Sequence, residues 1–249
     1  MTTVFVSGAS GKMGRKVVHM LQATDDLRVV GGLDRAASDA EDFPIFGDTA
    51  DINVTADVWV DFTIPTAARK NAEYSLAHGF DTIIGTSGMS NDDFAALGKI
   101  AADNGRKVMI VPNFGISAVL MMQFAAKAAK YMPDAEVVEI HHSDKIDAPS
   151  GTARATAQAI SKARQAKPVA PKQTDAPARG EWIDDVPVHA LRLPGYVAQE
   201  EVIFGAEGES LSISQISYDR SSFMAGIRLA IRNVADLPDA LTVGLDSLL

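Results

Sequence analysis

The sequence predicts an α/β protein with two domains: an N-terminal parallel sheet with helices on both faces, and a second α+β domain with a mixed sheet. Up to Pro112, short and continuously apolar segments alternate with helical ones, a pattern typical of a parallel sheet covered on both sides. Beyond Pro112 the pattern changes, and three late strands are separated by glycine turns, which predicts neighbouring strands of mixed direction.

The elements of the first domain follow from apolar runs and the residues that end them. The expected strands are 4–7, 27–33, 58–63, 81–85 and 108–111. Helices are expected at 12–24 and 66–78, the second ending at Gly79. A third helix is expected to begin at Ser90, because this serine has an acidic residue, Asp93, three positions on.

The second half contains longer elements and one long connection. The expected helices are 116–131, 152–166 and 223–234, and the expected strands are 136–141, 188–193, 197–204 and 210–218. Residues 167–185 contain Pro168, Pro171 and Pro177 and are expected to form a loop. An unstructured loop of more than roughly 12–15 residues is usually a lid, a binding loop or disordered.

Composition and charge exclude several classes of protein. Of the 249 residues 47% are hydrophobic, enough for one large or two modest cores. The net charge of -9 disfavours nucleic acid and acidic lipid as partners, and no apolar run approaches the roughly 20 residues that cross a bilayer. Without cysteine there are no disulfides and no thiolate ligands. With no secretion signal in MTTVFVSGAS, we expect a cytoplasmic protein.

A glycine-rich segment, Gly8-Ala9-Ser10-Gly11-Lys12-Met13-Gly14, directly follows the first expected strand and opens a helix. Its G-x-x-G-x-x-G spacing is one residue longer than the commonest dinucleotide fingerprint. Small residues let the backbone approach a pyrophosphate, whose charge the helix N-terminus stabilises. The alternative is a tight turn without a ligand, and the motif alone does not exclude it.

Asp34 strengthens the first interpretation, because it stands twenty positions beyond Gly14 at the end of the next strand. A ribose-binding carboxylate is expected at this spacing, which predicts a Rossmann-type cofactor domain. Arg35, with Lys12 and Arg15, would instead suit a 2′-phosphate, so NADH and NADPH both stay open. Two further small turns, 85–88 and 112–115, follow strands whose ends meet at one edge of such a sheet.

The densest chemistry lies in His141-His142-Ser143-Asp144-Lys145 and in the helix start at 149–152. Adjacent strand residues point to opposite faces, so the two histidines are poor ligands for one metal, and no metal is expected. A histidine and a lysine beside a helix N-terminus suit a proton donor with an orienting charge for an anion. The alternative is one packed and one solvated histidine, with Ser150 as a helix cap.

Taken together, these segments resemble the 4-hydroxy-tetrahydrodipicolinate reductases, also called dihydrodipicolinate reductases. The matching segments are GASGKMG (8–14), VDFT (60–63), GTSG (85–88), PNF (112–114) and HHSDKIDAPSGTA (141–153). They occur in matching order along nearly the whole chain, and the last is the specific one. Family members usually have threonine where this chain has Ser87, which keeps the hydroxyl group.

The resemblance implies a role for each matching position. The implied cofactor-binding residues are Gly8, Ala9, Ser10, Gly11, Lys12, Met13, Asp34, Gly85, Thr86, Ser87, Val111, Pro112, Asn113 and Phe114. His141 is implied as the catalytic acid/base and Lys145 as a second proton donor. The implied substrate-binding residues are His142, Ser150, Gly151 and Thr152.

The resemblance also implies the reaction and the assembly. NADH or NADPH would reduce the cyclic dicarboxylate 4-hydroxy-tetrahydrodipicolinate to tetrahydrodipicolinate with loss of water, in diaminopimelate and lysine biosynthesis. Residues 1–112 and 219–249 would bind the dinucleotide. Residues 113–218 would bind the substrate and assemble a homotetramer through their sheets.

The residues argue against three other classes of protein. A short-chain dehydrogenase needs a tyrosine four residues before a lysine, but the four tyrosines are followed at that spacing by His78, Ala135, Glu200 and Ser222. Aspartate-semialdehyde and glyceraldehyde-phosphate dehydrogenase chemistry needs a cysteine nucleophile, and the chain has none. A redox-sensing module would bind the dinucleotide without needing a proton donor, so the segment at 141–152 argues against it.

Overall fold

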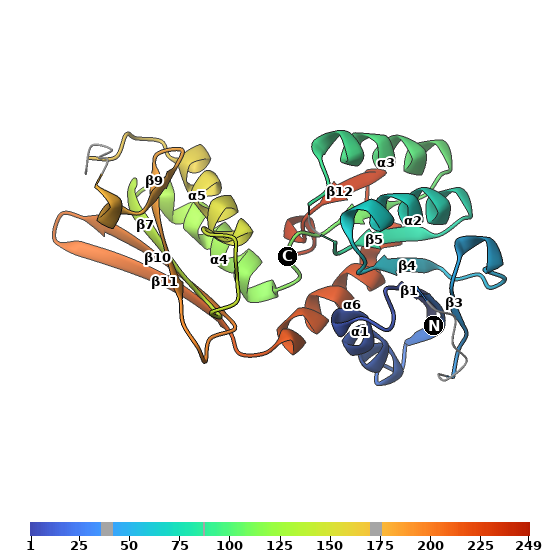
Figure 1. The fold of residues 1–249 in the computed structure, drawn as a ribbon. Helices are drawn as coiled ribbons and strands as arrows, with labels where there is room; N and C mark the ends of the chain where they lie inside the picture. The colour runs from blue at the N-terminus through green and yellow to red at the C-terminus, as the bar shows by residue number, and fades with distance from the viewer. Residues whose placement is uncertain (36–41, 87, 170–175) are drawn as a thin grey trace. The chain divides into compact units, whose positions relative to one another are not determined.

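The structure, a computed structural model, describes residues 1–35, 42–86, 88–169 and 176–249 and divides into two compact units (Figure 1). Unit 1 comprises residues 1–114 and 223–249, and unit 2 comprises residues 115–222. The C-terminal segment therefore belongs to the same unit as the N-terminus. Within the described ranges, every helix is too short or too polar to cross a lipid bilayer.

Unit 1 contains a seven-stranded sheet in which all neighbouring strands are parallel, in the order β12-β6-β5-β4-β1-β2-β3. The strands are β1 (Thr2–Ser7), β2 (Leu27–Leu33), β3 (Ile45–Phe46), β4 (Val58–Asp61), β5 (Asp81–Ile84), β6 (Val108–Ile110) and β12 (Leu241–Val243). The helices are α1 (Lys12–Gln22), α2 (Pro65–Ala77), α3 (Asn91–Asp103) and α6 (Met224–Asn233). This confirms the predicted Rossmann-type parallel sheet.

Helices cover both faces of this sheet, as its continuously buried strands require. In Figure 1, α2 and α3 lie on one face, and α1 and α6, which contact each other, lie on the opposite one. The buried Phe5 stacks on Trp59 at a centroid distance of 4.3 Å, and Trp59 in turn packs against Tyr74 of α2. The strand order reverses at β1, which lies between β2 and β4, and ligands of such sheets bind at this switch point.

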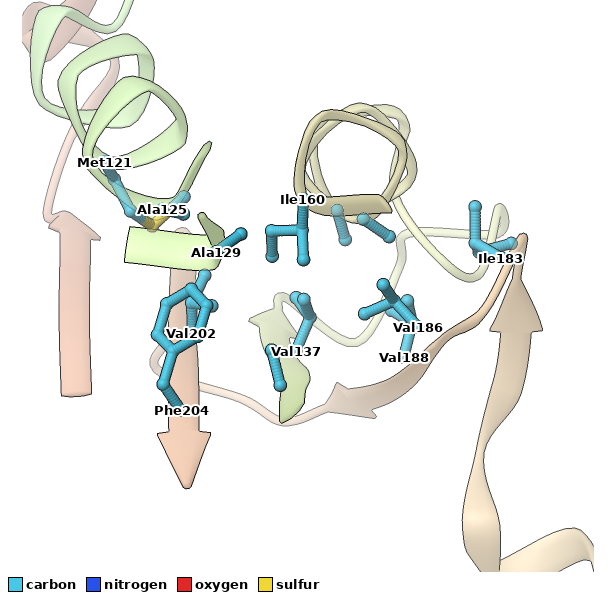
Figure 2. Packing of buried hydrophobic residues seen from close by; sticks show 13 residues of the cluster. Met121, Ala125, Ala129, Val137, Ile160, Ile183, Val186, Val188, Val202 and Phe204 are labelled. Atoms are coloured by element: carbon cyan, nitrogen blue, oxygen red, sulfur yellow. The ribbon is translucent and has the colours of Figure 1, made fainter. Parts of the chain in front are cut away.

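Unit 2 contains a five-stranded mixed sheet in the order β11-β10-β7-β9-β8, with only the β7–β9 pair parallel. Its strands are β7 (Asp134–His141), β8 (Glu181–Ile183), β9 (Val186–Arg192), β10 (Ala198–Ala206) and β11 (Glu209–Ser217), and its helices are α4 (Ile116–Ala129) and α5 (Gly151–Ala163). Burial alternates along β7, so Val137 and Glu139 face the helices. Val137 packs there with Val202 of β10 and with Ile160 of α5 (Figure 2). The predicted mixed sheet is confirmed.

The face of this sheet that points away from α4 and α5 carries apolar side chains in contact with solvent. Leu191, Ile203 and Ile216 lie there, with exposed fractions of 37%, 39% and 42%. An apolar sheet face of this kind is typical of a surface that another protein surface covers.

The expected boundaries were wrong in several places. Residues 167–185 were expected to be a loop, but the described part contains a 3-10 turn (Pro177–Arg179) and β8. β8 turns into β9 at Asp184, where φ is +54°, and acidic turn residues can adopt this conformation. β3 and β12 were not expected, because two or three residues are too short for a periodic pattern. α5 ends at Ala163 rather than at 166.

Candidate active site

Most predicted cofactor residues lie at one edge of the parallel sheet of unit 1. β1, β4, β5 and β6 run in the same direction, so the glycine segment and the turns after β5 and β6 follow the carboxyl ends of the strands. Ser87 is the exception, since it lies outside the described residues. The structure thus brings the three predicted turns to the edge where dinucleotides bind to sheets of this type.

The glycine segment has no room for larger side chains. Gly8 has a φ of +78°, and a Cβ atom added to Gly14 would lie 2.0 Å from the carbonyl oxygen of Gly8. α1 begins at Lys12, without a side-chain cap and without an acidic residue in its first turn. The positive end of α1 is therefore suited to a phosphate, and the segment fits a dinucleotide.

The carboxylate of Asp34, which directly follows β2, binds the backbone of the glycine segment. One of its oxygens accepts a hydrogen bond from the amide of Ser10 at 2.8 Å, and the other accepts one from the amide of Arg35 at 2.7 Å. Asp34 thus lies beside the glycine segment, where the ribose contact is predicted. Arg35 and Lys12 are both exposed.

The turn after β5 is shaped by two aromatic rings. A Cβ atom at Gly85 would lie 2.4 Å from the ring of Phe62 and 2.8 Å from that of Phe114. The buried Phe114 is approached in turn by α6, because a Cβ atom at Gly226 would lie 2.0 Å from its carbonyl oxygen. Phe114, one of the predicted nicotinamide contacts, therefore packs closely against the C-terminal segment.

A buried carboxylate, Asp61, joins the strand ends at this edge. It accepts hydrogen bonds from the amide and hydroxyl of Thr63 at 2.9 and 2.6 Å, from Asn71 of α2 at 2.8 Å and from Thr86 at 3.2 Å. The sequence analysis gave Asp61 no role of its own. The available signal was an acidic residue that ends a buried strand, Val58-Trp59-Val60-Asp61.

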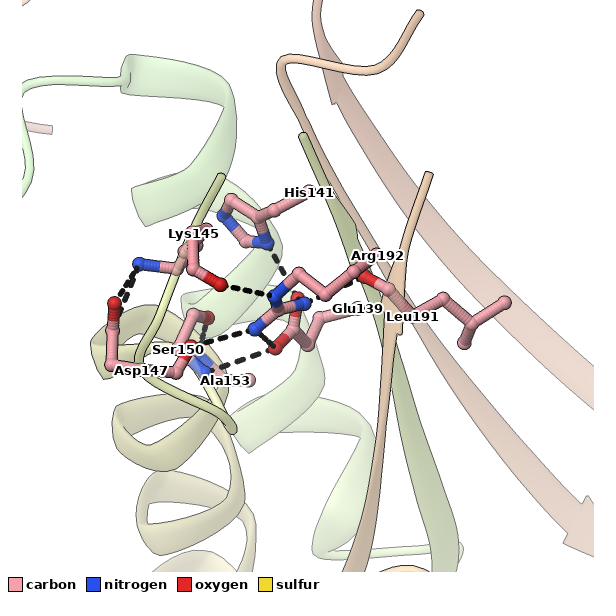
Figure 3. A network of polar contacts seen from close by, with 8 residues as sticks. All are labelled: Glu139, His141, Lys145, Asp147, Ser150, Ala153, Leu191 and Arg192. Carbon is pink, nitrogen blue, oxygen red and sulfur yellow. Dashed lines mark hydrogen bonds and ion pairs between the residues drawn. The ribbon is translucent and has the colours of Figure 1, made fainter. Parts of the chain in front are cut away.

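In unit 2 the predicted catalytic segment is organised by Glu139, whose carboxylate is fully buried (Figure 3). One carboxylate oxygen accepts from Nδ1 of His141 at 2.5 Å and from Nη1 of Arg192 at 2.8 Å. The other accepts from Nη2 of Arg192 at 2.9 Å and from the amide of Ser150 at 3.0 Å. Burial would raise the pKa of Glu139, but these hydrogen bonds outweigh it and lower the pKa to about 2.

Arg192 also holds the loop that carries Lys145. Its guanidinium group donates to the backbone carbonyl of Lys145 at 3.2 Å and to that of Asp147 at 2.7 Å. The Lys145 ammonium group contacts both carboxylate oxygens of Asp147 at 2.8 Å. His141 and the loop that carries Lys145 are therefore held by one network of hydrogen bonds.

The predicted substrate residues near the start of α5 differ in their exposure to solvent. Ser150 is buried, and its hydroxyl accepts from the amide of Ala153 at 3.1 Å, so it caps the helix. Gly151 is exposed, and no atom lies within 4 Å of an added Cβ atom. Thr152 is half-buried, as is His142, which lies just beyond the end of β7.

Glu139 and Arg192 were missed as functional candidates. Glu139 lies two residues before His141 on an expected strand, so both side chains face the same side, and a buried acid in Val137-Val138-Glu139-Ile140 was a usable signal. Arg192 is next to His141 only because β9 pairs with β7 in this register, which no local pattern indicates.

Glu200 lies directly opposite Glu139 on β10 and is 3% exposed. Burial raises the pKa of Glu200 to about 7; the charge of Glu139 adds to this, and a hydrogen bond from Thr156 opposes it. Since the neutral acid is favoured in the folded state, the stability it provides is complete below pH 4.5 and is lost as the pH rises towards 7.

We therefore expect Glu200→Gln to stabilise the protein more at pH 8 than at pH 5. The amide stays neutral, so the difference in free energy of unfolding should grow by roughly 3 kcal/mol between these two pH values. Urea denaturation at both pH values measures it. Glu201→Gln, on the opposite face of β10, is the matched control and should show no such growth. An equal effect of Glu200→Gln at both pH values would contradict the expectation.

The described residues include no group of three histidines or acids that could hold a metal ion.

Two models of one family together match nearly the whole chain: the N-terminal part of dihydrodipicolinate reductase matches residues 2–114, and the C-terminal part matches residues 117–249. The chain belongs to the dihydrodipicolinate reductase family. The boundary between the two matches coincides with the first boundary between units 1 and 2.

Individual relatives agree with this. The chain is 45% identical to the 4-hydroxy-tetrahydrodipicolinate reductase of Lactiplantibacillus plantarum, with 100% of both chains covered. It matches the dihydrodipicolinate reductase of Paenisporosarcina sp. TG-14, solved with dipicolinate bound, at a TM-score of 0.90 and 34% identity, again over 100% of both chains. A scyllo-inositol dehydrogenase from Lactobacillus casei is similar in fold alone, with a TM-score of 0.65, 10% identity, and 100% and 92% of the two chains covered.

Proposed function

We propose that this chain reduces 4-hydroxy-tetrahydrodipicolinate to tetrahydrodipicolinate, with loss of water, in diaminopimelate and lysine biosynthesis. The observation that carries the proposal is the Glu139–His141 pair beside Lys145 and the start of α5, in a chain whose relatives carry the name of this activity over their full length. It is thus a nicotinamide-dependent reductase.

The residues of unit 1 would bind and orient the cofactor. The glycine segment and the start of α1 would hold the pyrophosphate, Asp34 the adenosine ribose, and the turns at 85–87 and 111–114 the nicotinamide half. When bound, NADH or NADPH supplies a hydride. Gly8, Gly14 and Gly85 let the segments that would hold the cofactor pack closely, because a Cβ atom at each would meet backbone or ring atoms of the same unit.

The residues of unit 2 would hold the substrate and supply a proton. Hydride addition to a ring carbon conjugated with an imine moves negative charge towards the ring nitrogen and the adjacent carbon. A proton from His141 or from Lys145 neutralises this charge. His142, Lys145, Gly151 and Thr152 would bind the two carboxylates, which explains a local positive site in a chain with a net charge of -9.

The proposal extends to the assembly and the compartment. The apolar face formed by Leu191, Ile203 and Ile216 supports a homotetramer that assembles through the sheets of unit 2, and the biosynthetic role supports a cytoplasmic address. Light scattering of the purified protein tests the tetramer, and a monomer would contradict it.

The absorbance of NADH tests the function directly. Absorbance at the reduced-nicotinamide band should fall when the cyclic substrate is added and should be constant without it. A redox-sensing module would bind NADH but show no decay that depends on the substrate, and this result would contradict the proposal.

We expect Asp34→Asn to change the choice between cofactors. Loss of the carboxylate removes the acceptor for a ribose 2′-hydroxyl and also the charge that repels a 2′-phosphate, whereas the amide oxygen can still accept from Ser10. kcat/KM should fall about tenfold for NADH and change much less for NADPH. Steady-state kinetics with both cofactors measures this. Arg35→Ala is the reciprocal control and should weaken NADPH use, and equal losses for both cofactors in Asp34→Asn would contradict the role.

A further inference from the structure

Glu139 belongs to none of the sequence segments that carry the family resemblance, yet it is at the centre of the polar network in Figure 3. Its carboxylate is fully buried, on the central strand of the sheet of unit 2. Desolvation of such a buried charge is unfavourable unless several donors compensate for it.

Each oxygen of the Glu139 carboxylate accepts two hydrogen bonds. Arg192 approaches both oxygens as a bidentate partner, and each oxygen accepts one further hydrogen bond, from His141 or from Ser150. Bidentate arginine–carboxylate pairs are the most directional of charge-assisted hydrogen bonds. The carboxylate therefore has one well-defined position.

This position determines the state of the His141 ring. An ionised carboxylate has no proton to donate, so Nδ1 of His141 must carry the hydrogen of the 2.5 Å contact. The other ring nitrogen, Nε2, lies on the side of the ring away from Glu139 (Figure 3). Only Nε2 is then available to exchange a proton with a substrate.

The same carboxylate also determines where the second candidate donor lies. Arg192 is oriented by Glu139 and in turn binds the carbonyl groups of Lys145 and Asp147. The amide of Ser150, the N-cap residue of α5, donates to Glu139 as well. One acid thus connects His141, the Lys145 loop and the helix N-terminus.

We propose that Glu139 is a positioning residue of the reaction, which holds His141 in the tautomer with a free Nε2 and, through Arg192, fixes the loop that carries Lys145. This inference rests on the proposed function, because it assigns Glu139 a part in the same reaction. Glu139 itself does not touch the substrate; it acts through its two neighbours.

The charged groups around Glu139 come from several elements. His141 lies on the same strand, Arg192 on β9 and Glu200 on β10, while Lys145 and Asp147 lie in the loop that Arg192 binds. The neutral Glu200 adds no competing charge until the pH approaches 7.

The hydrogen-bond arrangement can be tested in the wild-type protein without any variant. The chain has five histidines, few enough for 15N correlation spectra to resolve each ring, with His141→Asn to assign the signal. The neutral ring of His141 should be the tautomer protonated at Nδ1. A ring protonated at Nε2 would overturn the proposal, whether or not the protein turns over its substrate.

The Glu139→Gln variant tests the consequence for catalysis. An amide has one acceptor oxygen, so it cannot accept all four hydrogen bonds, and its NH2 group would face donors in the place of one carboxylate oxygen. The ring of His141 is then no longer held in one tautomer. We expect kcat to fall about 10²-fold with KM for NADH unchanged. A change in KM alone, with kcat unaltered, would overturn the proposal.

The chain offers a matched control on the same strand. Glu136 binds a histidine, His189, and an arginine, Arg179, on the opposite face of β7, outside the candidate site. Glu136→Gln removes a comparable carboxylate and should leave kcat within about twofold of the wild type. If Glu139→Gln does not fold, the double variant Glu139→Gln/Arg192→Met removes both charges and should show the same loss of kcat.

A double-mutant cycle separates this inference from the proposed function. Where Glu139 acts mainly through His141, Glu139→Gln should lower kcat much less in a His141→Asn background than in the wild type. Full additivity would overturn the positioning role although the reductase activity stands. If the wild type shows no turnover of the cyclic substrate, the proposed function fails, and the tautomer measurement still tests the contact.

Discussion

His141→Ala is expected to lower kcat by about 10²–10⁴-fold and to leave NADH binding largely intact. The variant removes the ring that Glu139 holds at 2.5 Å, and with it the side chain placed to protonate the developing anion. The cofactor residues belong to unit 1, so the affinity for NADH should change little. Stopped-flow absorbance gives kcat, and calorimetric titration with NADH gives the dissociation constant.

The control for this variant is His189→Ala. His189 is also paired with a glutamate of β7, the half-buried Glu136, at 2.7 Å. His189 belongs to no predicted site. Its removal should leave kcat nearly unchanged. If His141→Ala keeps the wild-type kcat, His141 has no part in the mechanism and Lys145 becomes the remaining candidate donor.

Gly14→Ala is expected to weaken NADH binding strongly. The added Cβ atom would lie 2.0 Å from the Gly8 carbonyl oxygen, which is backbone and cannot rotate away. The glycine segment and the start of α1 must therefore move apart, and the backbone amides that suit a phosphate move with them. We expect NADH to bind roughly 10–100-fold more weakly and the free energy of unfolding to fall by about 1–3 kcal/mol.

Gly205→Ala separates this effect from the general effect of replacing a glycine. No atom lies within 4 Å of a Cβ atom at Gly205, and its φ is not positive. This control should leave NADH binding unchanged. Wild-type NADH affinity in Gly14→Ala would show that the glycine segment does not hold the cofactor.

The sequence predicted the parallel sheet and the glycine segment because both depend on local patterns. Short apolar strands, a capping serine at Ser90 with its partner Asp93, and the spacing from Gly14 to Asp34 are all readable along the chain. The long region at 167–185 was less readable. Its strand β8 is three residues long and is stabilised by pairing with β9, a partner that comes later in the sequence.

The candidate site was predictable in its residue types but not in its connections. Two adjacent histidines and a nearby lysine are unusual enough to be noticed in sequence. The bidentate pairing of Glu139 with Arg192 joins residues 53 positions apart. The close approach of Gly226 to Phe114 joins the two chain segments that form unit 1. Such contacts depend on strand register and on close packing of backbones, neither of which leaves a local periodic signal.

The interrupted course of unit 1 has a consequence for how the chain folds as it is made. β12 pairs with β6, and α6 packs against α1, yet both α6 and β12 follow the whole of unit 2 in the sequence. Residues 115–222 are contiguous and can complete their sheet during synthesis, whereas the N-terminal part must wait for its closing segment. A nascent chain stalled before residue 223 would therefore present an unfinished nucleotide fold to chaperones, although six of the seven strands of its sheet had already been translated.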